Sequence, residues 1–218
     1  MKETALHTSS LLQSALPNYQ ELLKEVGAEN LITHRGVLYV WIDPRQQPNS
    51  SQINIRSESG VEQIKLSGEE IRELEPNLSD QIQGGWHFPK AHHTLDPDLI
   101  LEKLYQNYLI RGGQFQKEEV SSIHPEESST QINHSDYDQV VVCTGAFSKS
   151  LVKQIEGQFI PLETERGYHI EFIEEQQLLS RPTSLVESGM YLTPLHNRLR
   201  AVGTVELGGL HSEISQAV

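Results

Sequence analysis

An arginine and two tyrosines in the last third of the chain have the side chains needed to bind a carboxylate. Arg166 and Tyr168 stand two positions apart, and Tyr191 follows in the next apolar run. Alternate residues of a strand point to the same face of a sheet, so Arg166 and Tyr168 could face one pocket. A guanidinium binds a carboxylate through two parallel hydrogen bonds, and a tyrosine hydroxyl can orient it. The residue types and spacing are therefore compatible with a site for a small carboxylate.

The same spacing also fits a purely structural role. In that interpretation Arg166 pairs with Glu163 or Glu165, and the tyrosines are ordinary residues of a sheet. The residues alone favour this second interpretation, since a single sequence offers limited evidence for long-range contacts.

A glycine turn after an apolar run is a second candidate. Thr144, Gly145 and Ala146 follow residues 140–143, which have the pattern of a buried strand. In nucleotide-binding folds ligands lie beyond the carboxyl ends of strands, where a glycine lets the backbone approach phosphate. A tight turn that needs glycine only for steric reasons fits the same residues.

Composition excludes several classes of function. The 218 residues carry a net charge of -13 and no cluster of lysine and arginine, so we expect no binding to nucleic acid or to anionic lipid. The single cysteine, Cys143, lies in the apolar run and is expected to be buried; it excludes an internal disulfide. His92 and His93 lack the spacing of a zinc motif, so no metal is expected. Neither a signal peptide nor a membrane span is visible, which favours a cytoplasmic location.

The elements that must position these residues follow from apolar spacing and helix signals. We expect a helix over residues 11–26 that is interrupted near Pro17, a helix opened by the Ser67/Glu70 capping box, and a helix opened by Asp96 and Pro97. Residues 45–59 are expected to form a loop, with a short strand at 53–55 at most. The expected strands lie at residues 37–42, 86–88, 115–120, 140–143, 168–173, 190–192 and 199–207, with a hairpin around 125–129.

Three stretches of the chain carry a family resemblance. Residues 161–168 read PLETERGY, residues 190–194 read MYLTP, and residues 203–207 read GTVEL. In this order and spacing they resemble the substrate-side sheet of the FAD-dependent D-amino-acid oxidase and dehydrogenase (glycine oxidase-like) superfamily. Further similar stretches are residues 16–28, residues 66–78, the helix opened by Asp96 and Pro97, residues 119–120 and residues 140–146. The similarity therefore covers nearly the whole chain but only the middle portion of a typical member.

The resemblance implies an α+β fold: an antiparallel substrate-domain sheet with helices, plus part of a Rossmann-like FAD-binding domain. It divides the chain into an N-terminal substrate-domain part (residues 1–95), a partial FAD-binding segment (96–158) and a substrate-domain sheet (159–218). It assigns substrate binding to Arg166, Tyr168 and Tyr191, with Arg200 as a rival arginine. Contacts to the cofactor would come from Val120, Thr144, Gly145 and Ala146.

The glycine fingerprint of a dinucleotide site is not found in the sequence, since no G-x-G-x-x-G follows a strand. We therefore expect part of an enzyme that oxidises a D-amino acid or related amine by hydride transfer to FAD, without an obligatory catalytic base. The isolated chain is expected to be inactive and not to retain FAD. The alternative is a non-catalytic binding module derived from this fold. The sequence leaves open whether the chain forms a homodimer or docks to the missing flavin-binding part.

Overall fold

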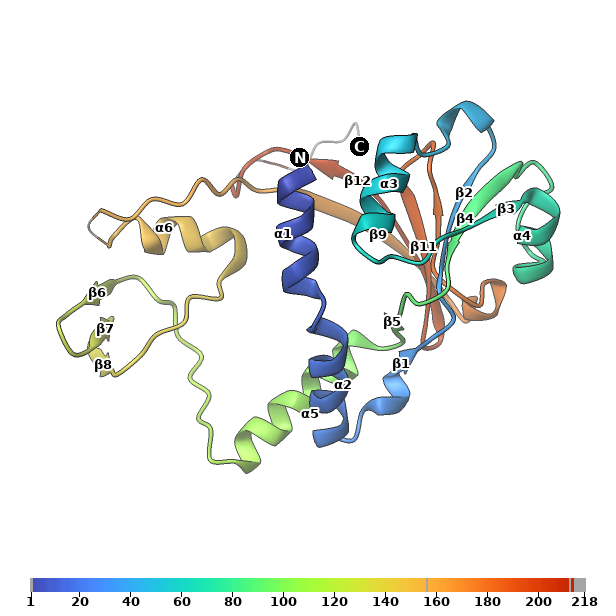
Figure 1. Cartoon of the computed structure of the whole chain (residues 1–218). Helices are drawn as coiled ribbons and strands as arrows, with labels where there is room; N and C mark the ends of the chain where they lie inside the picture. Colours follow the sequence, from blue (N-terminus) through green and yellow to red (C-terminus); the bar gives the residue numbers. More distant parts are fainter. Residues whose placement is uncertain (1, 156, 212, 214–218) are drawn as a thin grey trace. The chain divides into compact units, whose positions relative to one another are not determined.

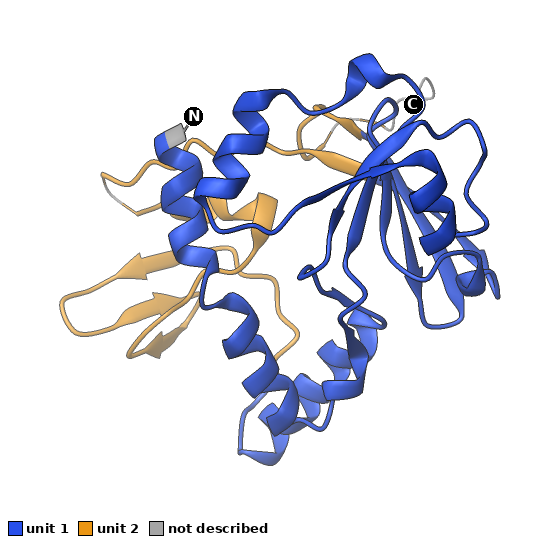
Figure 2. Ribbon diagram, turned by 45° about the vertical axis from the view of Figure 1, so that its right-hand side comes forward, with its two compact units in different colours: residues 1–114, 168–204 blue, residues 115–167, 205–218 orange. Residues whose placement is uncertain are grey.

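The computed structural model describes residues 2–155, 157–211 and 213. The chain divides into two compact units, shown in Figure 2: Met1–Gln114 with Tyr168–Thr204 form unit 1, and Phe115–Gly167 with Val205–Val218 form unit 2. The assignment of substrate and flavin roles to the three predicted segments stays a prediction.

Unit 1 is built on a seven-stranded sheet of order β3-β4-β2-β10-β11-β12-β9 (Figure 1). Strands β2 and β10 pair in parallel, whereas β3–β4, β4–β2, β10–β11 and β11–β12 are antiparallel. The predicted α+β class is confirmed, and so is antiparallel pairing in the last third. The strands are β2 (Val37–Trp41), β3 (Ile64–Ser67), β4 (Gly84–Phe88), β9 (Arg166–Ile173), β10 (Thr183–Leu185), β11 (Met190–Leu195) and β12 (Arg198–Glu206).

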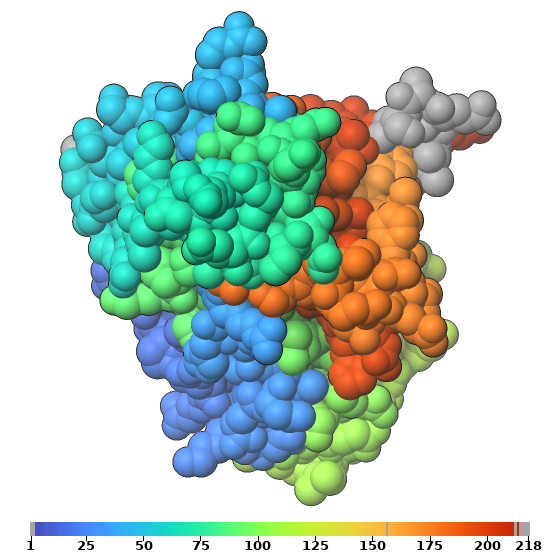
Figure 3. Space-filling model, turned by 90° about the vertical axis from the view of Figure 1, so that its right-hand side faces the viewer, coloured from blue at the N-terminus to red at the C-terminus, as the bar shows by residue number. Residues whose placement is uncertain are grey.

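One face of this sheet is covered by α4 (Gly68–Leu74). Leu38 and Val40 of β2 pack with Ile71 of α4, and all three are almost completely buried. The predicted capping box is present: Ser67 accepts from the backbone of Glu70, whose carboxylate accepts from the backbone of Ser67. Figure 3 views this side of the molecule, and the segment around α4, coloured teal, lies at its surface.

A second core lies between helices. Leu23 of α2 (Ala15–Glu25), Leu31 of η1 (Glu29–Leu31) and Ile100 of α5 (Pro97–Ile110) are buried together. The predicted start of α5 is confirmed, because the Asp96 side chain accepts from the backbone of Leu99. A small sheet of β1 (Ile32–Thr33) and β5 (His93–Thr94) connects this region to the large sheet.

The N-terminal helical region is broken as expected, with α1 (Lys2–Leu12) ending just before α2 begins. The prediction for residues 45–59 was wrong. They form η2 (Pro44–Gln46) and α3 (Ser50–Glu58), and α3 is opened by a reciprocal capping box between Asn49 and Gln52. This box stabilises a helix whose weak apolar pattern did not reveal it.

Unit 2 contains a three-stranded antiparallel sheet of β6 (Ile123–Pro125), β7 (Thr130–Ile132) and β8 (Ser135–Tyr137), then η3 (Gly145–Phe147) and α6 (Ser148–Val152). The predicted hairpin is confirmed by the β6–β7 pairing. The strands predicted at 115–120 and 140–143 were wrong, because neither stretch pairs with a strand of the described residues. Cys143 is consequently exposed rather than buried, and Val141 is 83% exposed.

Candidate functional site

Two tyrosine hydroxyls meet on the sheet face opposite α4. Tyr39 of β2 and Tyr191 of β11 are both in register with Ser184 of the intervening strand β10, so all three side chains lie on one face. The two hydroxyl oxygens are 2.9 Å apart. Ser184 is small enough to let the two larger side chains meet above it. The chain thus brings together two hydroxyls separated by 152 residues in sequence.

A guanidinium lies over the aromatic rings beside this pair. Arg56 of α3 places its Cζ atom 5.7 Å from the ring centre of Tyr39 and 5.2 Å from that of Phe88. The Tyr39 and Phe88 rings themselves meet edge to face at 5.3 Å. Together these residues form one side of a cavity of about 440 Å³. The cavity is lined by Val37, Tyr39, Arg56, Gly60, Val61, Glu62, Phe88, Lys90 and Ala91.

The charges in this cavity favour an anion. The Nη1 atom of Arg56 is buried and has no hydrogen-bond partner among the described residues. Lys90 and Glu62 form an ion pair of 3.1 Å and compensate each other. Burial and the hydrogen bond with Tyr191 raise the pKa of Tyr39 to about 12, so its hydroxyl stays protonated at neutral pH. The cavity therefore offers a cationic group and the neutral hydroxyl of Tyr39.

Of the predicted substrate residues, Tyr191 and Arg200 share this face. Arg200 is in register with Thr193, which lies two positions from Tyr191 on the same strand. The Nε atom of Arg200 is buried without a hydrogen-bond partner in the described part of the chain. Tyr168 is half-buried in β9. The roles predicted for these residues remain predictions.

Arg166 forms an ion pair, but not with the neighbours considered in the sequence. Its Nη1 atom lies 3.0 Å from a carboxylate oxygen of Glu206, with both side chains mostly buried. It also donates to the backbone oxygen of Glu213 at 3.3 Å. The guanidinium is thus engaged with a carboxylate of the protein, whereas the buried nitrogens of Arg56 and Arg200 are not.

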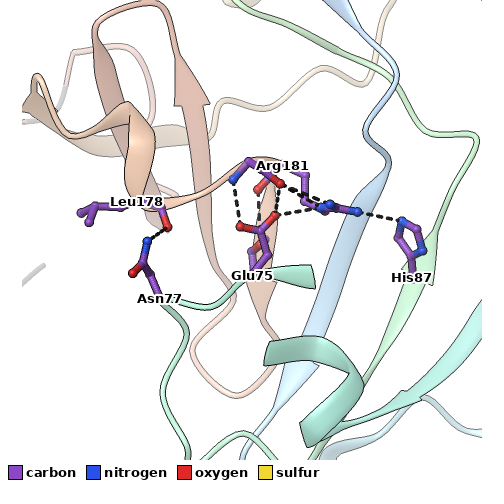
Figure 4. Close-up of polar contacts among 7 residues, drawn as sticks. Glu75, Asn77, His87, Leu178 and Arg181 are labelled. Atoms are coloured by element: carbon purple, nitrogen blue, oxygen red, sulfur yellow. Dashed lines mark hydrogen bonds and ion pairs between the residues drawn. The ribbon is translucent and has the colours of Figure 1, made fainter. Parts of the chain in front are cut away.

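A buried network of one ion pair and several hydrogen bonds anchors the segment that leads into β10, the strand between Tyr39 and Tyr191. Glu75, which is 2% exposed, accepts from the backbone of Ser180 at 2.8 Å, from the Ser180 hydroxyl, and from Nε of Arg181 at 2.8 Å (Figure 4). Arg181 reaches Nε2 of His87 at 3.4 Å, and burial together with Arg181 lowers the pKa of His87. Asn77 donates to the Leu178 carbonyl at 3.1 Å. These bonds link the end of α4 to the segment that leads into β10.

The residues predicted to contact flavin lie in unit 2. Gly145 has a φ of +53°, and a Cβ atom there would meet nothing within 4 Å, so its backbone is open to close approach. The Thr144 hydroxyl pairs with that of Ser148 at 3.0 Å, and Ala146 lies within η3. Val120 is 38% exposed. Contact of these residues with flavin stays a prediction.

The histidines and acidic residues do not form a metal site in the described part of the chain. No group of three or more His, Cys, Asp or Glu side chains is placed to hold a metal there. The rings of His92 and His34 instead meet edge to face, with their centroids 4.1 Å apart. Among the same residues, no helix has both the length and the apolar character needed to cross a bilayer.

Comparison with known proteins finds relatives that match nearly the whole chain. The chain is 28% identical to a D-amino-acid oxidase of Bradyrhizobium diazoefficiens over 97% of its own length and 51% of the relative's. It is 23% identical to a D-amino acid dehydrogenase of Dechloromonas aromatica, covering 90% and 50%. The chain thus spans about half the length of these curated relatives.

Solved structures agree with this fold. The chain superposes on glycine oxidase from Bacillus cereus with a TM-score of 0.73 at 20% identity, over 98% of this chain and 59% of that one. L-proline dehydrogenase from P. horikoshii gives 0.71 at 16% identity, over 98% and 58%. Residues 2–217 match the sequence model of the DAO family, described as FAD dependent oxidoreductase. The chain therefore belongs to the DAO family of FAD-dependent oxidoreductases, as the resemblance predicted.

Proposed function

We propose that this chain forms the substrate-binding portion of an enzyme that oxidises a D-amino acid or related amine by hydride transfer to FAD. The observation that carries the proposal is the sheet face on which Tyr39, Tyr191 and Arg200 are displayed, with Arg56 above Tyr39. Neutral hydroxyls and guanidinium groups are the donors that a substrate carboxylate requires. The names of the relatives, an oxidase and a dehydrogenase of D-amino acids, support the same substrate class.

In this proposal the residues bind and orient, and FAD accepts the hydride. Tyr191 donates a hydrogen bond from its hydroxyl to the carboxylate, while Tyr39 donates a hydrogen bond to the Tyr191 oxygen and fixes its orientation. Arg200 supplies positive charge from the neighbouring strand. No side chain removes a proton as an obligatory base. The backbone at Gly145, with Val120, Thr144 and Ala146, would contribute one edge of the flavin contact.

Binding by the chain itself tests the substrate half of the proposal. Calorimetric titration with glycine, D-alanine and proline is expected to give saturable heat for at least one of them, and Tyr191→Phe is expected to weaken that binding about tenfold, the effect of a lost charge-assisted hydrogen bond. The matched control, Tyr137→Phe, alters an exposed tyrosine of unit 2 and should bind like the wild type. Absence of heat with all three amino acids would count against the assignment.

We further propose that the isolated chain does not retain FAD and is inactive. Three of the residues proposed to contact flavin, Val120, Thr144 and Gly145, are exposed, and Ala146 is half-buried, which supports this. After incubation with FAD and gel filtration, the protein fraction is expected to lack visible absorbance. A yellow fraction with one flavin per chain would show that the residues present are sufficient.

A non-catalytic binding module is the second candidate. It is favoured by one observation, namely that the cavity beside Tyr39 is formed wholly within unit 1 and needs no residue of the proposed flavin edge. The two candidates make the same prediction for ligand binding and differ only in whether a bound flavin is reduced.

A further inference from the structure

The cavity between α3 and the strands β2 and β4 contains a cation, Arg56, that pairs with no carboxylate among the described residues. Arg56 forms no ion pair among those found in the described residues, and its Nη1 atom is both buried and without a hydrogen bond. A buried donor left unsatisfied costs free energy, and the cost is larger for a charged group. Stacking on two aromatic rings offsets part of it but does not supply an acceptor for this nitrogen.

The other residues that line the cavity indicate which kind of ligand would fit beside Arg56. Val37, Val61 and Ala91 give apolar surface, and Phe88 adds an aromatic ring. The Lys90–Glu62 pair is internally neutral and largely exposed, so it does not compete strongly for an anion. Tyr39 connects this cavity to Tyr191 through the hydroxyl pair. The volume of about 440 Å³ lies in the range of small-molecule sites.

We propose that Arg56 is the anchor for the carboxylate of a small ligand whose aliphatic body packs against Val37, Val61 and Phe88. The rings of Tyr39 and Phe88 hold the guanidinium plane so that its fork is preorganised for two oxygens. The inference rests on the proposed function only in assigning this carboxylate to the amino acid that is oxidised. Neither the α3 helix nor Arg56 was singled out by the sequence pattern.

The test uses the whole chain without flavin and three probes: D-leucine, 4-methylpentanoate and its neutral isostere 4-methylpentanamide. Calorimetry is expected to show binding of both carboxylates and at least about tenfold weaker binding of the amide, since one charge-assisted contact has about that effect. Arg56→Met keeps an unbranched side chain but removes the charge. It is expected to remove the preference for the carboxylates over the amide. Arg56→Lys should retain part of it.

Two matched variants separate the effect of Arg56 from that of other arginines. Arg45→Gln alters an arginine that is 89% exposed and paired with Asp43, so it should bind as the wild type does. Arg200→Gln tests the rival arginine on the same sheet face. Equal binding of acid and amide, or a preference that survives Arg56→Met but disappears in Arg200→Gln, would overturn the Arg56 site. Because no flavin is present, such a result rejects the site alone, whereas the proposed oxidation is tested separately by flavin reduction.

Discussion

The hydrogen bond between the Tyr39 and Tyr191 hydroxyls leads to a specific prediction about the pKa of Tyr39. Burial raises the pKa of Tyr39 to about 12, the bond to Tyr191 adds to the rise, and the charge of Arg56 opposes it. Tyr191→Phe should therefore lower the pKa of Tyr39 toward its ordinary value of 10.0, and Arg56→Met should raise it. Near-ultraviolet absorbance of tyrosinate during an alkaline titration measures both shifts.

The same shift has a consequence for stability. Since the folded pKa lies above the unfolded one, the contribution of the neutral hydroxyl is complete below about pH 10 and is lost as pH rises toward 12. Denaturant unfolding across this window should show a steeper loss in the wild type than in Tyr39→Phe. Identical pH profiles for the two proteins would show that Tyr39 titrates normally.

Among the site residues, sequence reasoning reached those in recognisable strands and missed the others. Tyr191 was singled out from its place in an apolar strand pattern, whereas Arg200 entered only through the family resemblance. Tyr39 looked like any residue of a buried strand, since its partner lies 152 positions away. Arg56 was hidden in a stretch predicted as a loop, although Asn49 and Gln52 were a signal for the helix that carries it.

At the level of elements, Glu75 is predicted to fix α4 against the segment before β10. Glu75→Gln would leave Arg181, whose side chain is 14% exposed, without its counter-ion. Breaking a buried pair in this way costs about 3 kcal/mol or more, measured as the free energy of unfolding in urea. The matched control, Asp43→Asn, alters an ion pair whose arginine is 89% exposed and should leave the unfolding midpoint nearly unchanged. Equal effects of both changes would contradict the assignment.

Gly85 in β4 permits α4 to pack closely on the sheet. A Cβ atom there would lie 2.6 Å from the Tyr39 carbonyl oxygen and 2.7 Å from Cδ1 of Ile71. Gly85→Ala should therefore destabilise the fold by about 1–3 kcal/mol, as overpacking does. Gly203→Ala is the matched strand control, because its Cβ would meet only Met190 at 3.7 Å. Thermal unfolding of the two variants measures the difference, and an undisturbed Gly85→Ala protein would refute the packing argument.

The elements show where local signals suffice. Capping residues and apolar spacing predicted α4 and α5 because these helices are defined by their own sequence. Residues 140–143 have the composition of a buried strand but no pairing partner in the described residues, and a strand forms only with a neighbour. Composition therefore overestimated the order of that stretch and the burial of Cys143.

On the scale of the molecule, the two units carry different parts of the proposed enzyme. Unit 1 contains the sheet face with the tyrosines and the cavity with Arg56, whereas the candidate flavin contacts belong to unit 2. The chain spans about half the length of the curated relatives. In the proposed function, hydride transfer would need further flavin-binding segments besides the candidate contacts in unit 2.

The most direct test of this account supplies those segments from a relative. A chimera would place this chain in the matching region of Bacillus cereus glycine oxidase, which the chain covers to 59% of that protein's length. Visible absorbance of the purified, flavin-loaded chimera is then followed without oxygen as D-amino acids are added. The account predicts that the flavin bands disappear with at least one D-amino acid and more slowly in Tyr191→Phe. A chimera that holds stoichiometric FAD yet is reduced by none of them would contradict it.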